Sequence, residues 1–247
     1  MRAVTEPEHR RTTRAGYDAI AEEYADRFRH ELENAPLDRA LLAAFAELVR
    51  RDHETAEVLD VGSGPGSVTA HLQGLGLSVR GVDLSPAMVE LARREHPSVA
   101  FEVGEMSALD VPDASLAGVV AWYSLIHVPE AGRPEVLAEF HRVLVPDGHL
   151  LLGFQIGDDT QHHDRALGHA VSLDFHRLEP DAVVALLQAA GFEVVVRTEK
   201  APEPGSRASP IPQGTVIARR PPDRHAGAAS CQETPNRSST HPNGPNP

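Results

Sequence analysis

Residues 58–67 read Val58-Leu59-Asp60-Val61-Gly62-Ser63-Gly64-Pro65-Gly66-Ser67. The apolar run that ends at Val61 predicts a buried parallel strand, because no polar alternation interrupts it. Three glycines at alternate positions then predict a tight turn from strand to helix. A ligand can approach the amides of such a turn closely, since no Cβ atoms stand in the way. The run therefore indicates a loop that binds a nucleotide-type ligand.

Two details bear on which nucleotide this is. The dinucleotide fingerprint is Gly-x-Gly-x-x-Gly, but here the third glycine comes one residue early, at Gly66, and Ser67 stands in the fingerprint's glycine position. The next predicted strand, residues 77–83, ends in Asp83. A carboxylate at a strand tip can accept hydrogen bonds from both hydroxyls of an adenosine ribose. These details favour an adenosine ligand other than a dinucleotide, with an NAD site or a purely structural turn as the alternatives.

Composition narrows the class of protein. A chain of 247 residues is long enough for one substantial α/β domain, and its net charge of −13 argues against a nucleic-acid partner. We find no apolar run long enough for a membrane span and no apolar signal region at the N-terminus. The only cysteine, Cys231, excludes an intrachain disulfide. These features predict a cytoplasmic protein that has no membrane or nucleic-acid partner.

Strands and helices alternate along the chain. Helices are predicted within the first 35 residues, from Pro36, and near 65–75, 86–95, 133–144 and 180–190, and strands at 58–61, 77–83, 99–103, 116–122, 149–155, 192–197 and 214–219. This pattern predicts a Rossmann-like α/β fold: a doubly wound, mainly parallel, seven-stranded sheet with helices on both faces and an N-terminal helical cover. Ligands of such sheets bind beyond the carboxyl ends of the strands, where the glycine loop and Asp83 both lie.

Three segments are expected. Residues 1–52 form a helical cap, in which Tyr17 and Tyr24 share a face at helical spacing. Residues 53–220 form the ligand-binding domain. Residues 221–247, rich in Pro, Ser, Asn and Gly, form a disordered tail.

The chain resembles the small class I methyltransferases that use S-adenosylmethionine (SAM), in the group called type 11. The loop Asp60-x-Gly62-x-Gly64-x-Gly66 and Asp83 carry this resemblance, together with residues 101–106, 119–127 and 139–144. It covers roughly residues 15 to 220. The motifs specify SAM binding well and the methyl acceptor poorly.

The resemblance also implies roles for individual residues. Gly62 and Gly64 would lie under the methionine part of SAM, with Asp60 facing its ammonium group, and Asp83 would bind the ribose. The adenine would meet Leu84, Met88 and Glu105. The full implied cofactor set is Tyr17, Tyr24, Asp60, Gly62, Ser63, Gly64, Asp83, Leu84, Met88, Glu105, Met106 and Ala121.

His127 is the candidate catalytic base, because it follows the predicted fourth strand at the rim of the expected cleft and its unperturbed pKa suits proton transfer near neutrality. The alternative is a loop histidine bonded to backbone. Residues 157–176 are the expected specificity region, and Tyr123, Gln155 and His169 are candidate substrate contacts by position. A metal site is not expected, since the four histidines of that region have no metal-ligand spacing.

These observations predict an enzyme that moves a methyl group from SAM to an oxygen or nitrogen of a small molecule, leaving S-adenosylhomocysteine (SAH). Two alternatives stay open: an NAD(P)-dependent oxidoreductase built on the same sheet, and a protein that binds SAM or SAH without turnover. A protein substrate is a further option. The sequence does not indicate an oligomeric state.

Overall fold

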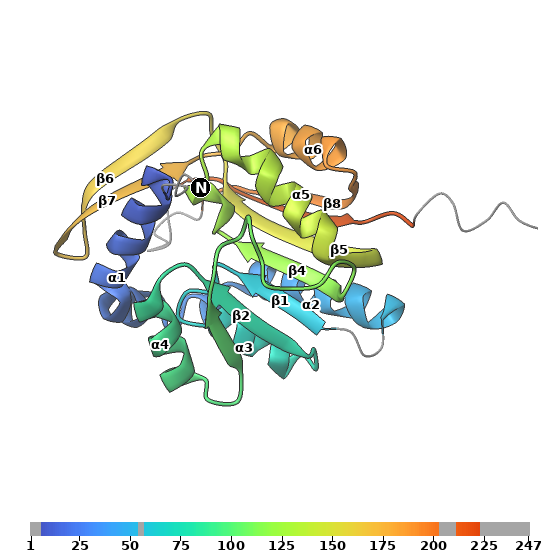
Figure 1. Cartoon of the computed structure of the whole chain (residues 1–247), viewed down its shortest axis with the longest axis horizontal. Helices are drawn as coiled ribbons and strands as arrows, with labels where there is room; N and C mark the ends of the chain where they lie inside the picture. Colours follow the sequence, from blue (N-terminus) through green and yellow to red (C-terminus); the bar gives the residue numbers. More distant parts are fainter. Residues whose placement is uncertain (1–5, 54–56, 203–210, 223–247) are drawn as a thin grey trace, which may run out of the picture.

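The computed structural model of the chain describes residues 6–53, 57–202 and 211–222 (Figure 1). A central sheet is built from seven strands: β1 (Glu57–Val61), β2 (Val79–Asp83), β3 (Ala100–Val103), β4 (Leu116–Trp122), β5 (Leu144–Gln155), β8 (Glu193–Lys200) and β9 (Gln213–Arg219). The helices are α1 (Glu8–Phe28), α2 (Pro36–Asp52), α3 (Ser67–Gly74), α4 (Pro86–Glu95), α5 (Arg133–Val143) and α6 (Pro180–Ala189). Short 3-10 turns lie at η1 (Leu32–Asn34), η2 (Leu125–His127) and η3 (Glu130–Gly132).

The strand order in the sheet is β3-β2-β1-β4-β5-β9-β8. Neighbours from β3 to β5 pair in parallel, whereas β9 runs antiparallel to both β5 and β8. The order reverses between β1 and β4, and the carboxyl ends of these strands are where such sheets bind ligands. The predicted seven-stranded, mainly parallel, doubly wound sheet is confirmed.

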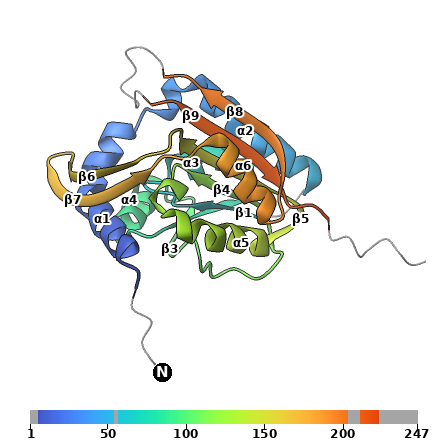
Figure 2. The same ribbon diagram turned by 90° about the horizontal axis from the view of Figure 1, so that it is seen from above.

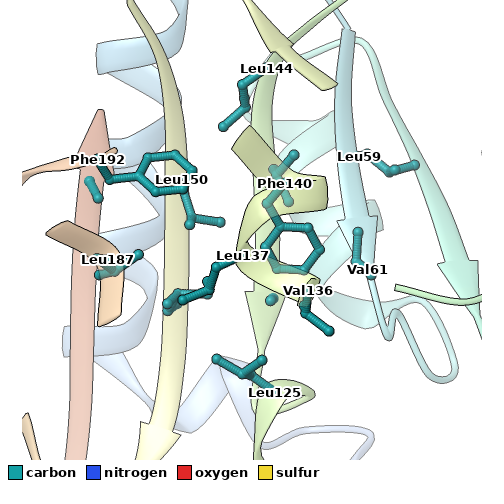
Figure 3. Packing of buried hydrophobic residues seen from close by; sticks show 14 of the residues in the cluster. Leu59, Val61, Leu125, Val136, Leu137, Phe140, Leu144, Leu150, Leu187 and Phe192 are labelled. Carbon is teal, nitrogen blue, oxygen red and sulfur yellow. The ribbon is translucent and has the colours of Figure 1, made fainter. Parts of the chain in front are cut away.

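Two apolar layers hold the helices on the sheet. On one face α2 and α3 pack on β1, β2 and β4 through a cluster that includes Phe45, Val49, Leu72 and Val120. On the other face α5 and α6 pack through a larger cluster of which Phe140 and Leu187 are members. Figure 3 shows this second layer, with Leu137 and Phe140 of α5 set against strands β1 and β5. Burial of this apolar surface fixes the strand ends that carry the loops of the site.

The start of α4 follows the sequence prediction. Ser85 is the residue before the helix, and its hydroxyl accepts a hydrogen bond from the amide of Met88 at 3.1 Å. Pro86 occupies the first helical position, where a missing amide proton has no cost. The capping residue lies two residues after Asp83, so the start of α4 fixes the strand tip.

One part of the secondary structure was missed by the sequence prediction. The expected specificity region contains an antiparallel hairpin, β6 (Thr160–Ala166) and β7 (His169–His176), which forms a sheet of its own. Its two-residue turn has Leu167 at φ +49° and Gly168 at φ +91°. Such turns normally carry Asn-Gly or Asp-Gly, so Leu-Gly gave no hairpin signal. Figures 1 and 2 show the hairpin beside α1, away from the main sheet.

A second difference concerns β5. A turn was predicted at residues 146–148 with the strand beginning at His149, but β5 begins at Leu144 and contains an irregularity. Pairing with β4 jumps from Leu116–Leu144 to Gly118–His149, and Asp147 has φ +63°. The turn residues are thus absorbed as a bulge.

Cys231 and residues 223–247 of the expected disordered tail (221–247) lie outside the described residues, as do residues 1–5 of the expected cap. Within the described part of the chain, no helix combines the length and the apolar character that a bilayer crossing requires.

Candidate functional site

A pocket opens at the carboxyl ends of β1, β2 and β4, and α1 covers it. Its wall is formed by Pro7, His9, Arg10, Thr13, Arg14, Tyr17, Tyr24, Val61, Gly62, Gly64, Asp83, Leu84, Ser85, Met88, Gly104, Glu105, Met106, Ser107, Trp122, Tyr123, Ser124, His127, Val128, Gly132, Glu135 and Val136. Eleven of these residues were predicted from the sequence as site residues: Tyr17, Tyr24, Gly62, Gly64, Asp83, Leu84, Met88, Glu105, Met106, Tyr123 and His127.

The glycine loop forms the floor of the pocket, and two of its glycines serve different purposes. Gly62 has φ +76°, and a Cβ there would lie 2.2 Å from Cβ of Ser124, so this glycine is required by packing. Gly64 has φ +52°, and a Cβ there would meet no atom within 4 Å. The open space above Gly64 belongs to the pocket and leaves room for a ligand against the backbone.

Asp83 closes β2 and lies at the wall of the pocket. Its Oδ2 accepts a hydrogen bond from the amide of Gly64 at 2.8 Å, and its Oδ1 accepts one from the amide of Ser85 at 2.8 Å. Burial raises the pKa of Asp83, and the two backbone hydrogen bonds partly offset that increase. Each carboxylate oxygen has a second lone pair, so the orientation that these amides fix leaves acceptor capacity for a ligand hydroxyl.

Beside Asp83 the wall is apolar on one side and acidic on the other. Leu84 and Met88 supply the apolar part, and Met88 is fully buried. Glu105 forms an ion pair with Arg10 of α1, and Arg10 also donates to the hydroxyl of Ser107 at 2.7 Å. The loop after β3 is therefore fastened to the covering helix.

The face of α1 that lines the pocket is cationic near the N-terminal end of the helix and aromatic further along. Arg10, Thr13 and Arg14 lie at its N-terminal end, and Tyr17 and Tyr24 follow at helical spacing. The two tyrosine rings meet edge to face at 5.6 Å between centroids. The sequence prediction found the tyrosines of this stripe and missed its cationic end, although the same spacing leads back from Tyr17 to Arg14 and Arg10.

His127 is held between α1 and the hairpin. Its Nδ1 lies 2.9 Å from the carbonyl oxygen of Asp174, which can only accept, so Nδ1 carries the proton. Its Nε2, 2.7 Å from the Tyr17 hydroxyl, is then the acceptor and Tyr17 is the donor. Burial lowers the pKa of His127 to about 4 and raises the pKa of Tyr17 well above its usual range. Both groups are neutral near pH 7.

The residues that end β4 line the inner part of the pocket. Tyr123 has φ +56°, a conformation that residues with a side chain rarely adopt, and its amide donates to the carbonyl of Gly153 at 2.9 Å. Trp122 packs edge to face on Tyr123, and burial raises the pKa of the Tyr123 hydroxyl. Val128 and Val136 complete this apolar region of the wall.

Five of the predicted site residues lie outside this wall. Asp60 is buried, accepts a hydrogen bond from the Thr69 hydroxyl at 2.6 Å, and has its pKa raised to about 7 by burial. Ser63 is buried, and its hydroxyl has no hydrogen-bond partner among the described residues. Ala121 is fully enclosed in the core next to α5.

The other two were substrate candidates. Gln155 ends β5 in register with Gln213, and its carbonyl accepts from the amide of Leu178 at 2.9 Å. His169 is half-buried on β7 and contacts Glu23 of α1 at 3.1 Å. It therefore helps to dock the hairpin on α1 and does not reach the pocket wall.

The remaining histidines of the hairpin face separate neighbours. His162 contacts Asp174 at 2.7 Å, His163 stacks edge to face on Phe175, and His176 contacts the Thr160 hydroxyl at 2.8 Å. Among the described residues, no three His, Cys, Asp or Glu side chains gather as a metal site would require.

Comparison with known proteins agrees with this geometry. Residues 58–148 match a family model described as a methyltransferase domain. The demethylmenaquinone methyltransferase of Chlorobaculum parvum is 28% identical over 151 residues, which cover 60% of this chain and 61% of that protein. The O-methyltransferase cnsE of Penicillium expansum is 32% identical over 154 residues, covering 58% of this chain and 54% of that protein. The chain thus spans less than two thirds of the length of these relatives.

Among solved structures, magnesium protoporphyrin IX methyltransferase from Synechocystis with bound SAM superposes with a TM-score of 0.64. The match covers 89% of this chain and 100% of that one at 14% sequence identity, so it concerns the fold. The family match covers the glycine loop, Asp83, Glu105 and His127, the residues that the pocket brings together. Residues 58–148 therefore match a methyltransferase domain, and the fold around them is the one seen in solved SAM-dependent methyltransferases.

Proposed function

We propose that this protein transfers a methyl group from SAM to an oxygen or nitrogen atom of a small molecule. The observation that carries the proposal is a single pocket in which the Asp83 carboxylate, the bare backbone of Gly64 and the Tyr17–His127 pair share one wall. Methyl transfer to a protonated acceptor requires an adenosyl-binding region and a proton-accepting pair of side chains in the same cavity.

The residues present fit SAM. Asp83 is oriented by two amides and keeps lone pairs for ribose hydroxyls. The space above Gly64 is open, since a Cβ there would meet no atom of the described residues within 4 Å. Leu84 and Met88 would contact the adenine ring. Glu105 would accept a hydrogen bond from the adenine amino group while its carboxylate is shared with Arg10. Tyr17 and Tyr24 would cover the cofactor from α1.

Asp60 has a different role in this proposal from the one that the resemblance implies. Its carboxylate bonds Thr69 at the start of α3 and does not line the pocket. We assign it to holding the glycine loop on α3. The same reasoning gives Ser63 and Ala121 structural roles, since both are buried outside the wall.

When bound, SAM supplies a methyl group on a positively charged sulfur, which leaves as a neutral thioether. The chain's own residues align the acceptor and take its proton. The Tyr17 oxygen can accept a hydrogen bond from the acceptor while its own hydroxyl donates to His127 Nε2. As an oxygen acceptor gains the methyl group it becomes strongly acidic, so its proton passes to the Tyr17 oxygen while the Tyr17 proton moves to His127.

A base with a pKa of about 4 suffices for an oxygen acceptor, because the proton leaves a cationic oxygen and not a neutral one. A methylated amine is only weakly acidic, so a nitrogen acceptor would release its proton to water and would not use this pair. Both groups are enclosed, and the pocket wall beyond them is formed by Trp122, Tyr123, Val128 and Val136. This apolar inner surface favours an acceptor with an apolar body. The net charge of −13 weighs against a nucleic-acid substrate.

The test uses labelled SAM and a pool of small metabolites, followed by mass spectrometry of the product. The proposal predicts label transfer and SAH binding, with no change on addition of NADH. A protein that binds SAH and transfers no label to any fraction is a sensor. One that binds NADH and not SAH is an oxidoreductase. Label found on added polypeptides and not on the metabolites indicates a protein substrate.

This proposal gives the N-terminal segment and the following domain separate roles. Helix α1 within residues 1–52 acts as the cover of the site, and residues 53–220 bind the cofactor and acceptor. Closure rests on contacts at several points along α1, including Asp18 with the Ser85 hydroxyl at 2.5 Å and Tyr17 with His127. Cofactor entry therefore requires these contacts to open.

A further inference from the structure

The cationic end of the pocket is not used by the proposed methyl transfer. Arg10 and Arg14 are four residues apart on α1 and both line the pocket. The partners of Arg10, Glu105 and Ser107, are themselves part of the wall, so this guanidinium is satisfied inside the site. The partner of Arg14 comes from outside the wall.

That partner is Glu6, which precedes the covering helix. Both ends of the Arg14 guanidinium donate to the two carboxylate oxygens of Glu6, each at 2.7 Å. This two-point geometry is the one in which arginine recognises a planar carboxylate. The side chains of Arg14 and Glu6 are 34% and 32% exposed, so the pair is open to solvent, and a second carboxylate would restore the two-point contact that Glu6 gives up. One carboxylate can therefore replace another there at small cost.

Resting on the proposed function, we propose that the methyl acceptor carries a carboxylate group, which displaces Glu6 and binds the Arg14 guanidinium. Glu6 holds the position of that group until the acceptor arrives. The apolar body of the acceptor then contacts Val128, Val136 and Trp122, which adds buried apolar area that Glu6 does not provide.

The spacing along α1 sets the size of the acceptor. Arg14 and Tyr17 are three residues apart on one helix face, so their Cβ atoms lie about 5–6 Å apart. Both side chains line the same pocket, so a compact acceptor with its carboxylate and its reacting atom on one rigid body can be tested against this pair. A hydroxybenzoate has this form, and its amide keeps the shape without the charge.

The experiment is calorimetric titration of SAH-saturated full-length protein with 4-hydroxybenzoate and with 4-hydroxybenzamide. The proteins are the wild type, Glu6→Gln, Arg14→Gln, Arg14→Lys and the control Arg11→Gln. Arg11 is also on α1, is 61% exposed, and lies outside the pocket wall, so its loss changes the net charge equally.

We expect Glu6→Gln to bind the benzoate at least fivefold more tightly than the wild type, because the internal competitor is gone. Arg14→Gln should weaken benzoate binding at least tenfold relative to Glu6→Gln, and Arg14→Lys should fall between them because it keeps charge and loses the two-point contact. Arg11→Gln should match the wild type, and the amide should bind all five proteins alike.

Equal benzoate affinity in Glu6→Gln and Arg14→Gln overturns the proposal, as does benzoate binding no tighter than the amide or undetectable in Glu6→Gln. The proposed function fails separately, through loss of SAH binding in the wild type, which is measured first. Because the readout is binding, the carboxylate site is scored whether or not this probe is methylated. SAH affinity and thermal unfolding of each variant show that it is folded.

Discussion

The hydroxyl of Tyr17 lies 2.7 Å from Nε2 of His127, and this contact joins the covering helix to the turn that follows β4. The second ring nitrogen of His127 is bonded to the carbonyl of Asp174 in β7. Three segments far apart in sequence therefore meet at one imidazole. The arrangement fixes the tautomer and keeps the ring neutral.

The first prediction concerns the pH dependence of stability. The pKa of His127 is about 4 in the folded protein and about 6.5 when unfolded, so below pH 6.5 the unfolded chain binds more protons at this residue. The contribution of His127 to the free energy of unfolding is fully present above pH 6.5. It is lost as the pH falls toward 4, and the total loss is roughly 3 kcal/mol. Urea unfolding of the wild type and His127→Asn between pH 4 and 8 measures it. The two curves should converge as the pH falls, and parallel curves would contradict the account.

Removal of the Tyr17 hydroxyl should affect turnover more than cofactor binding. Tyr17→Phe keeps the ring contact with Tyr24 and deletes the hydrogen bond to His127, which should cost about 1 kcal/mol of stability. We expect kcat to fall by about 100-fold, in the range of general base contributions, while the SAH dissociation constant changes less than threefold. Steady-state kinetics and calorimetry separate the two. An unchanged kcat would remove Tyr17 from the proton path.

The two loop glycines should respond differently to the same substitution. Gly62→Ala places a Cβ 2.2 Å from Ser124 at φ +76°, so it should lower the unfolding free energy by several kcal/mol. Gly64→Ala meets no atom and should cost only about 1–2 kcal/mol for its positive φ, yet it should weaken SAH binding at least tenfold. Thermal unfolding and SAH titration of both variants test this pair. Equal loss of stability in both, or normal SAH affinity in Gly64→Ala, would contradict it.

The sequence predicted the sheet because its strands have local signals. The apolar run 116–122 and the Ser85-Pro86 cap each specify an element without help from distant contacts, and the structure has both at the predicted residues. Gly64, Asp83 and His127 were found because strand ends in a parallel sheet gather at one edge. The role of Asp60 was not predictable, since its bond to Thr69 depends on how α3 turns back over β1.

The cationic stripe and the hairpin were missed for two different reasons. Arg10 and Arg14 are ordinary surface residues until α1 is placed over the pocket, and nothing in the local sequence specifies that placement. The β7 strand alternates in period two, as a strand should, but the turn before it lacks the residues that mark hairpins. Tertiary packing on α1 compensates for the unfavourable turn.

That turn gives the fourth prediction. Leu167 has φ +49°, where asparagine is favoured over leucine, so Leu167→Asn should stabilise the protein by about 0.5–1 kcal/mol. Gly168→Ala, at φ +91°, should destabilise it by at least as much. Thermal unfolding of the two variants checks both signs. A loss of stability in Leu167→Asn would show that the leucine side chain, and not its backbone angle, dominates at this turn.

SAH binding by Asp83 variants is the most direct test of the proposed function, because Asp83 is expected to accept hydrogen bonds from the adenosine ribose. SAH is titrated calorimetrically into the wild type, Asp83→Asn and the control Glu102→Gln, whose exposed carboxylate pairs with Arg80 on the neighbouring strand. We predict one SAH site in the wild type and in Glu102→Gln, and an affinity roughly 10–100-fold weaker in folded Asp83→Asn, as expected for loss of charged hydrogen bonds. No heat with SAH in the folded wild type, or equal affinity in Asp83→Asn, would contradict the central claim.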